Sequence, residues 1–198
     1  MKSSPFSILR GVNTLVLAAG HGGGDPGAVG GGKTEAGEAI VIVDEMARLL
    51  TPVLGKGAVV VAPHADDTHE TIFWVNKRYA WGTAWAIEVH RDSASIAEPA
   101  ASWRCGVYHG ASAASVEIAR GMRTVLQESG AHVSTWARSH KGSRFGSLGW
   151  INQLRCLSHL MEFGFMQGRH DAAHINRLAA AGARAVAWAF AGAVLPRA

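Results

Sequence analysis

Several features that would assign the chain to a broad class are missing from its sequence. It has two cysteines, Cys105 and Cys156, and neither lies in a CxxC pair, so we expect buried free thiols rather than a zinc knuckle or a redox motif. No block of five or more Lys and Arg occurs, and basic and aromatic residues do not interleave, which argues against a nucleic-acid partner. The longest apolar run, residues 185–195, is shorter than the ~20 residues of a membrane span, so we expect no stable membrane insertion.

The N-terminal segment also lacks the pattern of a signal peptide. Its apolar part, residues 14–19, is too short, and Arg10 and Asn13 interrupt the stretch before it. We therefore expect the protein to be synthesised in the cytoplasm. A formal net charge of +4 and a pI near 9.4 favour a polyanionic partner, without choosing among nucleic acid, teichoic acid and phospholipid.

Apolar residues are plentiful, at 48% of 198 residues, which is enough to give one domain over residues 1–198 a substantial core. Short β-rich runs alternate with amphipathic stretches. This pattern predicts a single α/β domain, with helices on both faces of a central twisted sheet of about six strands, mostly parallel or mixed. We expect a monomer. The expected strands are residues 14–18, 58–62, 84–90, 105–108, 133–137 and 157–163, and the expected helices are residues 34–50, 71–79, 112–129 and 171–194.

A glycine-rich segment, residues 20–34, follows the first expected strand and precedes a helix. From Gly27 it satisfies GxxxxGK[ST], which taken alone indicates a phosphate-binding loop and a P-loop NTPase. The context disagrees, because such a loop begins directly at the end of a strand, whereas Asp25 and Pro26 separate Gly27 from this strand. Residues 41–44 belong by periodicity to the helix and not to a Mg²⁺-binding strand. The NTPase is kept as an alternative function.

Three possible metal ligands stand at the edges of separate elements. His21 follows the first strand, Glu35 begins a helix fourteen residues later, and His90 ends a later strand. Clefts form at strand ends in α/β sheets, so these side chains can converge on one cation, and two His with one Glu suit Zn²⁺. Most lone histidines bind no metal, however, and spacing alone leaves this site open. His170 and His174 form a rival pair without the intervening Glu of a zincin, and we take them as surface residues.

Glu162 interrupts an apolar run, residues 157–165, where an unpaired carboxylate would be costly to bury. A catalytic role explains such a position. An ion pair with Arg78 or Arg155 explains it equally well. The residues by themselves do not choose between these two interpretations.

Four separated motifs carry a resemblance to a known family. They are AAGHGGGDPGA at residues 18–28, TEA at 34–36, IEVH at 87–90 with Arg78 before it, and EFGF at 162–165. In order and separation they resemble the motifs of the zinc-dependent N-acetylmuramoyl-L-alanine amidases of the amidase-3 type, found in bacterial autolysins and phage endolysins. The resemblance covers about residues 14 to 171.

The resemblance implies a site and an activity. His21, Glu35 and His90 would hold Zn²⁺, and Glu162 would be the catalytic acid–base residue. The substrate would be peptidoglycan, cut at the amide between N-acetylmuramic acid and the L-alanine of the stem peptide. Together with the missing signal peptide, this predicts a phage-type endolysin that acts on the wall of its host. A non-catalytic peptidoglycan-binding relative is a further alternative.

Three departures from the family pattern stand out. Ala-Ala at residues 18–19 replaces the usual Asp-Pro, and Arg-Asp-Ser at residues 91–93 replaces Ala-Asn-Ala. Gly168 stands near the expected Asn. None of the three changes a proposed metal ligand or Glu162, so they bear on substrate preference rather than on the reaction.

Overall fold

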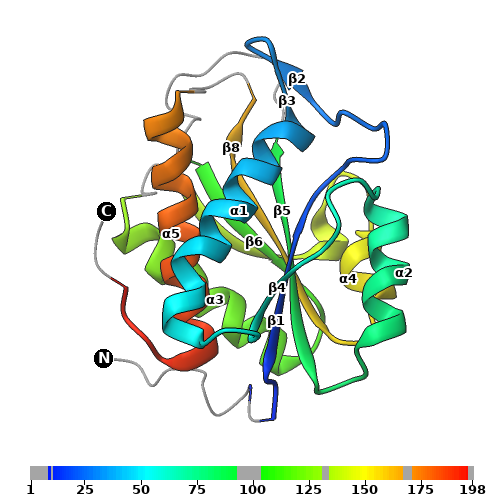
Figure 1. The fold of residues 1–198 in the computed structure, drawn as a ribbon, viewed down its shortest axis with the longest axis vertical. Coiled ribbons are helices and arrows are strands. Elements are labelled where there is room, and N and C mark those ends of the chain that lie inside the picture. Colours follow the sequence, from blue (N-terminus) through cyan, green and yellow to red (C-terminus); the bar gives the residue numbers. More distant parts are fainter. Residues whose placement is uncertain (1–8, 10, 93–103, 131–133, 167–170, 196–198) are drawn as a thin grey trace.

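The architecture is a six-stranded sheet covered by helices on both faces, as a computed structural model shows (Figure 1). The structure describes residue 9 and residues 11–92, 104–130, 134–166 and 171–195. In spatial order the strands are β4 (Val59–Val61), β1 (Thr14–Ala19), β5 (Ala84–Asp92), β8 (Leu157–Phe165), β6 (Arg104–His109) and β7 (Ser134–Ser139). All neighbours are parallel except β6 and β8, so the sheet is mixed but mostly parallel, as predicted.

Two apolar clusters hold the helices against the sheet. On one face α1 (Glu35–Leu54), α3 (Ala113–Glu128) and α5 (Ala172–Ala191) pack over side chains such as Ile87, Val89 and Phe163. On the other face α2 (Thr68–Arg78) and α4 (Gly149–Gln153) cover a smaller cluster that contains Val16, Ala86 and Leu160. Figure 1 shows the first three helices to the left of the strands and the other two to the right.

Helix ends follow the local sequence. Thr34 caps α1 by accepting a hydrogen bond from the Gly37 amide at 3.1 Å, and this fixes Glu35 as the first helical residue. At α2, Asp67 and Glu70 form a reciprocal capping box, in which each side chain accepts a hydrogen bond from the backbone amide of the other residue. Among the described residues, no helix is both long and apolar enough to cross a bilayer.

Most predicted elements are confirmed with small shifts of their ends. The sequence did not predict the two short strands inside the glycine-rich segment, where β2 (Val29–Gly30) and β3 (Lys33–Thr34) form a two-stranded hairpin. Pairs of two residues are too short to show alternation. The sequence also gave no signal for the five-residue α4 or for the 3-10 helix over His140–Gly142.

One buried histidine corrects the sequence interpretation, and a second has a structural role. His174 is fully buried in the first turn of α5 and is not a surface residue, as we had predicted, whereas His170 lies outside the described residues. His159 is also fully buried, and its Nδ1 accepts a hydrogen bond from Trp85 Nε1 at 2.8 Å. Burial lowers the pKa of His159 to about 4, which keeps this imidazole neutral and structural.

Candidate active site

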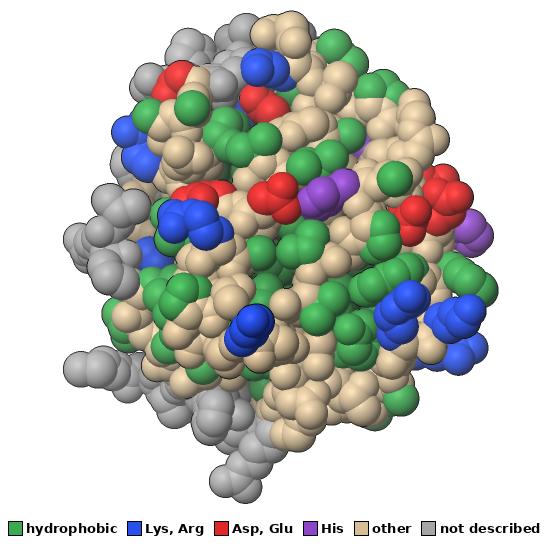
Figure 2. Space-filling view, viewed as in Figure 1, with side chains coloured by type: hydrophobic (Ala, Val, Ile, Leu, Met, Phe, Trp, Pro, Cys, Tyr) green, Lys and Arg blue, Asp and Glu red, His purple; other side chains and the backbone are tan. Residues whose placement is uncertain are grey.

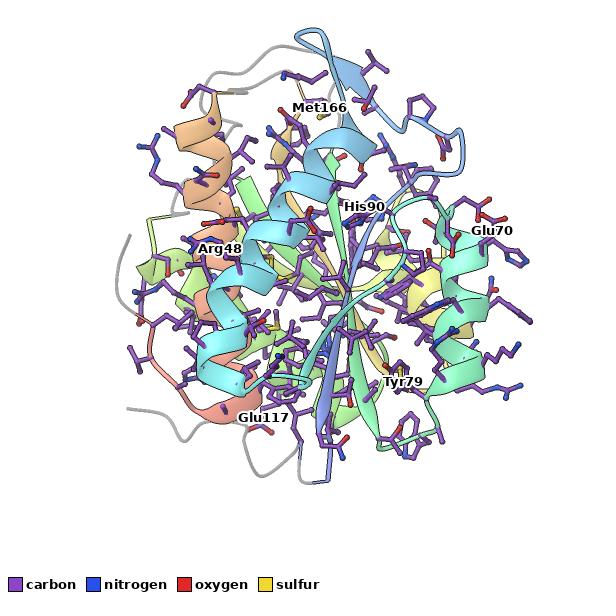
Figure 3. The ribbon with its side chains drawn as sticks, viewed as in Figure 1. Arg48, Glu70, Tyr79, His90, Glu117 and Met166 are labelled. Carbon is purple, nitrogen blue, oxygen red and sulfur yellow. The ribbon has the colours of Figure 1, made fainter. Side chains whose placement is uncertain are left out.

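Four predicted site residues meet at one end of the sheet, where the parallel strands finish. His21 follows β1, His90 lies near the end of β5, and Glu162 lies on the adjacent β8, paired in register with His90. Glu35 is the first residue of α1, which packs on the face of the sheet opposite to α2 and α4. Figure 3 shows His90 below the first turn of α1, at the upper ends of the strands. Carboxyl ends of parallel strands form the clefts of open α/β sheets, so this position is the expected one for a site.

Two glycines make room for the imidazoles. A Cβ atom on Gly20 would lie 2.2 Å from the His90 ring, and one on Gly27 would lie 2.6 Å from the His21 ring. Gly27 also has φ +64°, a region that favours glycine. His21 itself has φ +66°, so the loop holds it in a conformation uncommon for a residue with a side chain. The glycine-rich segment therefore packs against histidine rings.

The Glu35 carboxylate contacts both imidazoles of the site. Its Oε1 lies 2.8 Å from Nδ1 of His90, and its Oε2 lies 3.2 Å from Nε2 of His21. Backbone amides hold the carboxylate in place: Ala28 donates to Oε2 at 3.0 Å and Arg91 donates to Oε1 at 3.1 Å. The sequence did not reveal these two amides, because Ala28 directly precedes the β2–β3 hairpin and Arg91 directly follows His90.

Each imidazole has a second carboxylate beside its other ring nitrogen. Asp25 Oδ2 lies 2.8 Å from Nδ1 of His21, and the amide of Gly27 holds Asp25 by donating to Oδ1 at 2.9 Å. Glu88 Oε2 lies 3.0 Å from Nε2 of His90, in a geometry that does not make a hydrogen bond. Such outer carboxylates orient metal-binding histidines and fix which nitrogen carries the proton.

The ionisable groups of the site shift one another's pKa values. Burial alone would raise the pKa of Glu35, but hydrogen bonds from His21 and His90 outweigh it and hold that pKa far below its ordinary value. Burial would lower the pKa of His90, yet Glu88 and Glu35 raise it well above the usual value. The hydrogen bond to Glu35 likewise raises the pKa of His21, against burial. Acidic groups therefore dominate this pocket and favour a positive charge inside it.

Glu162 is the second titratable carboxyl of the site. Its Oε2 is enclosed and has no hydrogen-bond partner among the described residues. Burial raises its pKa to about 8; His90 opposes that rise, while Asp92 and Glu35 add to it. The ion-pair interpretation is wrong for the described part of the chain, since neither Arg78 nor Arg155 pairs with Glu162; Arg78 instead stacks on Trp74 at 4.1 Å.

The substitution of Arg for the family's Ala after the third motif has a structural explanation. Arg91 is fully buried, and its Nη1 donates to Glu38 Oε2 at 2.7 Å. Its Nη2 donates to the carbonyl of Phe165 at 2.8 Å. Arg91 therefore ties α1 to β5 and β8 directly behind Glu35 and His90.

The donor set fits a divalent metal ion. His21, Glu35 and His90 each offer one ligand atom, and these atoms lie within 4.8 Å of one another. A cleft of about 680 Å³ opens over them and is also lined by Glu88, Glu162 and Tyr108. The enclosed Glu162 Oε2, which has no hydrogen bond among the described residues, is consistent with a site built to hold something more than its own side chains.

The phosphate-loop alternative does not match this geometry. The GxxxxGK[ST] segment begins at a glycine that packs on His21, and residues 29–34 form a hairpin instead of a continuous cradle of amides. Residues 41–44 lie within α1, as periodicity predicted. The lysine of the motif, Lys33, is exposed on β3.

Comparison with known families decides between these alternatives. The amidase-3 family profile, described as N-acetylmuramoyl-L-alanine amidase, matches residues 15–195. The chain belongs to this amidase family. The match spans nearly the whole chain and identifies the amidase as an enzyme that acts on peptidoglycan. No curated protein sequence matches the amidase.

Solved structures share the fold of this amidase. The amidase AmiC2 of Nostoc punctiforme is 22% identical with a TM-score of 0.69, covering 88% of this chain and 95% of its own. The catalytic domain of CwlV from Bacillus (Paenibacillus) polymyxa is 20% identical with a TM-score of 0.67, covering 87% and 96%. The catalytic domain of the CD27L endolysin, which targets Clostridium difficile, is 17% identical with a TM-score of 0.67, covering 92% and 99%. The amidase therefore has the same fold as these three proteins.

Proposed function

We propose that this amidase is zinc-dependent and hydrolyses the bond between N-acetylmuramic acid and the L-alanine of the stem peptide. His21, Glu35 and His90 would hold the ion, and Glu162 would move the protons. The observation that carries the proposal is the approach of three ligand atoms to within 4.8 Å of one another, beside an enclosed carboxyl group. Two imidazoles and one carboxylate form a donor set that catalytic zinc uses, with one position left for water or substrate.

Neighbouring residues orient the three proposed ligands. A divalent ion held by His21, Glu35 and His90 would supply a positive charge that polarises the amide carbonyl and makes a water molecule more acidic. Glu35, held by two backbone amides, keeps its charge and its orientation. Asp25 beside His21 and Glu88 beside His90 turn the other nitrogen of each ring toward Glu35.

Glu162 serves as base and then as acid. Its carboxylate removes a proton from the attacking water, whose oxygen forms a bond with the lactyl carbonyl carbon. The protonated carboxyl then donates this proton to the amide nitrogen as the C–N bond breaks. The products are a lactyl carboxylate and the free amine of L-alanine. A pKa of about 8 in the absence of a cation supports this role, since a nearby positive charge brings it closer to neutral pH.

Metal analysis combined with mass spectrometry of digested peptidoglycan tests the proposal. We expect about one zinc per chain, loss of activity in chelator, and recovery when Zn²⁺ is added back. The digest should contain stem peptides with a free L-alanine amine and glycan strands with intact lactyl groups. Cleavage between sugars or within the peptide cross-links would refute the assigned bond, and full activity in chelator would refute the metal.

We propose further that the amidase lyses walls in the manner of an endolysin. The support is the endolysin catalytic domain among the proteins of the same fold and a net charge of +4, which favours an anionic wall. On the face shown in Figure 2 the basic side chains are scattered, apart from a group over the end of α2. Purified protein should bind sacculi and lower the turbidity of permeabilised cells. Binding without turbidity loss would indicate a non-catalytic relative instead.

A further inference from the structure

The outer part of the cleft differs in charge from its floor. Acidic groups surround the imidazoles at the floor, whereas two exposed arginines, Arg138 and Arg144, line the cleft farther out. Arg138 comes from β7 and Arg144 from the segment after the 3-10 helix. Tyr108 and the exposed Phe145 line the cleft with them.

The sheet sets the position of Arg138. Tyr108 on β6 pairs in register with Arg138 on β7 and with Leu160 on β8, so these side chains share the face that carries Glu162. The Arg138 guanidinium lies 5.0 Å from the centre of the Trp136 ring, which itself packs on Tyr108 at 4.6 Å.

Arg144 reaches the same region from the other segment. Its guanidinium lies 4.8 Å from the centre of the Phe145 ring. Burial raises the pKa of Tyr108, and the positive charges of Arg138 and Arg144 oppose that rise, so both guanidinium groups lie near one phenol.

Neither arginine has a carboxylate partner within the part of the chain that the structure describes. Other arginines do have one: Arg48 pairs with Glu45 at 2.6 Å and Arg91 pairs with Glu38 at 2.7 Å. Two unpaired guanidinium groups at the edge of a substrate cleft form a positive pole that complements a negative group on the substrate.

We infer that Arg138 and Arg144 bind a free carboxylate on the stem peptide, and this inference rests on the proposed function. The lactyl group of the glycan has no charge while it forms the scissile amide. The stem peptide is the part of peptidoglycan with free carboxylates, unless they are amidated. Planar guanidinium groups bind a carboxylate by donating paired N–H···O hydrogen bonds to its two oxygens. The two arginines would therefore make the amidase prefer an acidic stem over an amidated one.

Matched substrates test the inference. Sacculi stripped of secondary wall polymers are divided, and one half is amidated with carbodiimide and ammonia. Release of L-alanine amines is measured on both halves. The wild type should cut the untreated sacculi faster. Arg138→Gln and Arg144→Gln should each lower the ratio of the two rates about two- to fivefold, the size of an exposed ion pair. Lys141→Gln is the matched control, an exposed cation three residues from each arginine that does not line the cleft.

The ratio separates this inference from the proposed function. No release from either substrate would overturn both. Release at equal rates from both, or arginine variants that lower both rates in proportion, would overturn the subsite and leave the amidase activity standing. An equal drop of the ratio in Lys141→Gln would show a general effect of surface charge and would also overturn the subsite. Because each variant is compared with itself, partial loss of folded protein does not change the ratio.

Discussion

Replacement of Glu162 by Gln should separate catalysis from metal binding. The variant keeps the size and polarity of the side chain but cannot take up a proton from water. We expect it to retain zinc, because the three ligand atoms come from other residues, and to lose amine release by about 10²- to 10⁴-fold, the usual contribution of a general acid–base group. Retention of more than a tenth of the activity would refute the role of Glu162.

The same substitution has a pH-dependent effect on the metal-free fold. Burial raises the pKa of Glu162 from 4.5 to about 8, so the folded state binds a proton that the unfolded state releases. The penalty of ionising Glu162 is therefore absent below pH 4.5, grows as pH rises, and is complete above pH 8. At ~1.4 kcal/mol per pH unit, the full penalty is on the order of 2 to 5 kcal/mol after allowance for relaxation around the carboxylate.

Thermal unfolding with chelator measures this penalty. Glu162→Gln should melt close to the wild type at pH 5 and ~5 to 15 °C above it at pH 9, since ~1 kcal/mol shifts the Tm of a chain of this size by ~2 to 4 °C. Glu117→Gln is the control, an exposed carboxyl on α3 that Figure 3 shows at the opposite end of the molecule from His90. A Tm difference that does not change with pH would refute the reasoning about the enclosed carboxyl.

Three further predictions concern the proposed metal site. Gly20→Ala should weaken zinc binding at least tenfold, because the added Cβ would lie 2.2 Å from the His90 ring. Gly110→Ala is the control and should bind zinc normally, because the nearest atom to its added Cβ is 3.6 Å away. Equal zinc affinities of the two variants in a competition titration would contradict this prediction. Glu88→Gln should weaken zinc binding by roughly 10- to 100-fold in the same titration, the usual effect of removing an outer carboxylate, and an unchanged affinity would remove Glu88 from the site. Zinc binding at pH 7 should release protons, because the pKa values of His21 and His90 are raised and the ion needs neutral imidazoles; calorimetry in two buffers of different ionisation heat would show it, and identical heats would argue against it.

The sequence predicted the elements whose signal is local. Alternation and helical spacing located the six strands and four long helices, and the fully buried Ile42, Met46 and Leu50 of α1 recur at helical spacing. His21, Glu35 and His90 were predicted as metal ligands from family motifs, and the structure brings these three side chains together.

Other parts of the site depend on contacts between distant segments. The sequence did not predict a role for Glu88. Its role depends on its contact with His90, which lies two residues later on the same strand. Burial of His174 depends on how α5 packs, which its spacing from His170 cannot show. The positive pole of Arg138 and Arg144 requires β7 to lie beside β6, a pairing set by the whole sheet.

The buried pair of Arg91 and Glu38 constrains how this amidase can diverge. Loss of either partner alone removes the shortest ion pair of an enclosed charge, at a cost of up to ~3 to 5 kcal/mol, which is a large part of the stability of most domains. Replacing both at once by apolar residues of similar volume is close to neutral. We therefore expect these two positions, 53 residues apart, to covary, so that homologues carry both charges or neither.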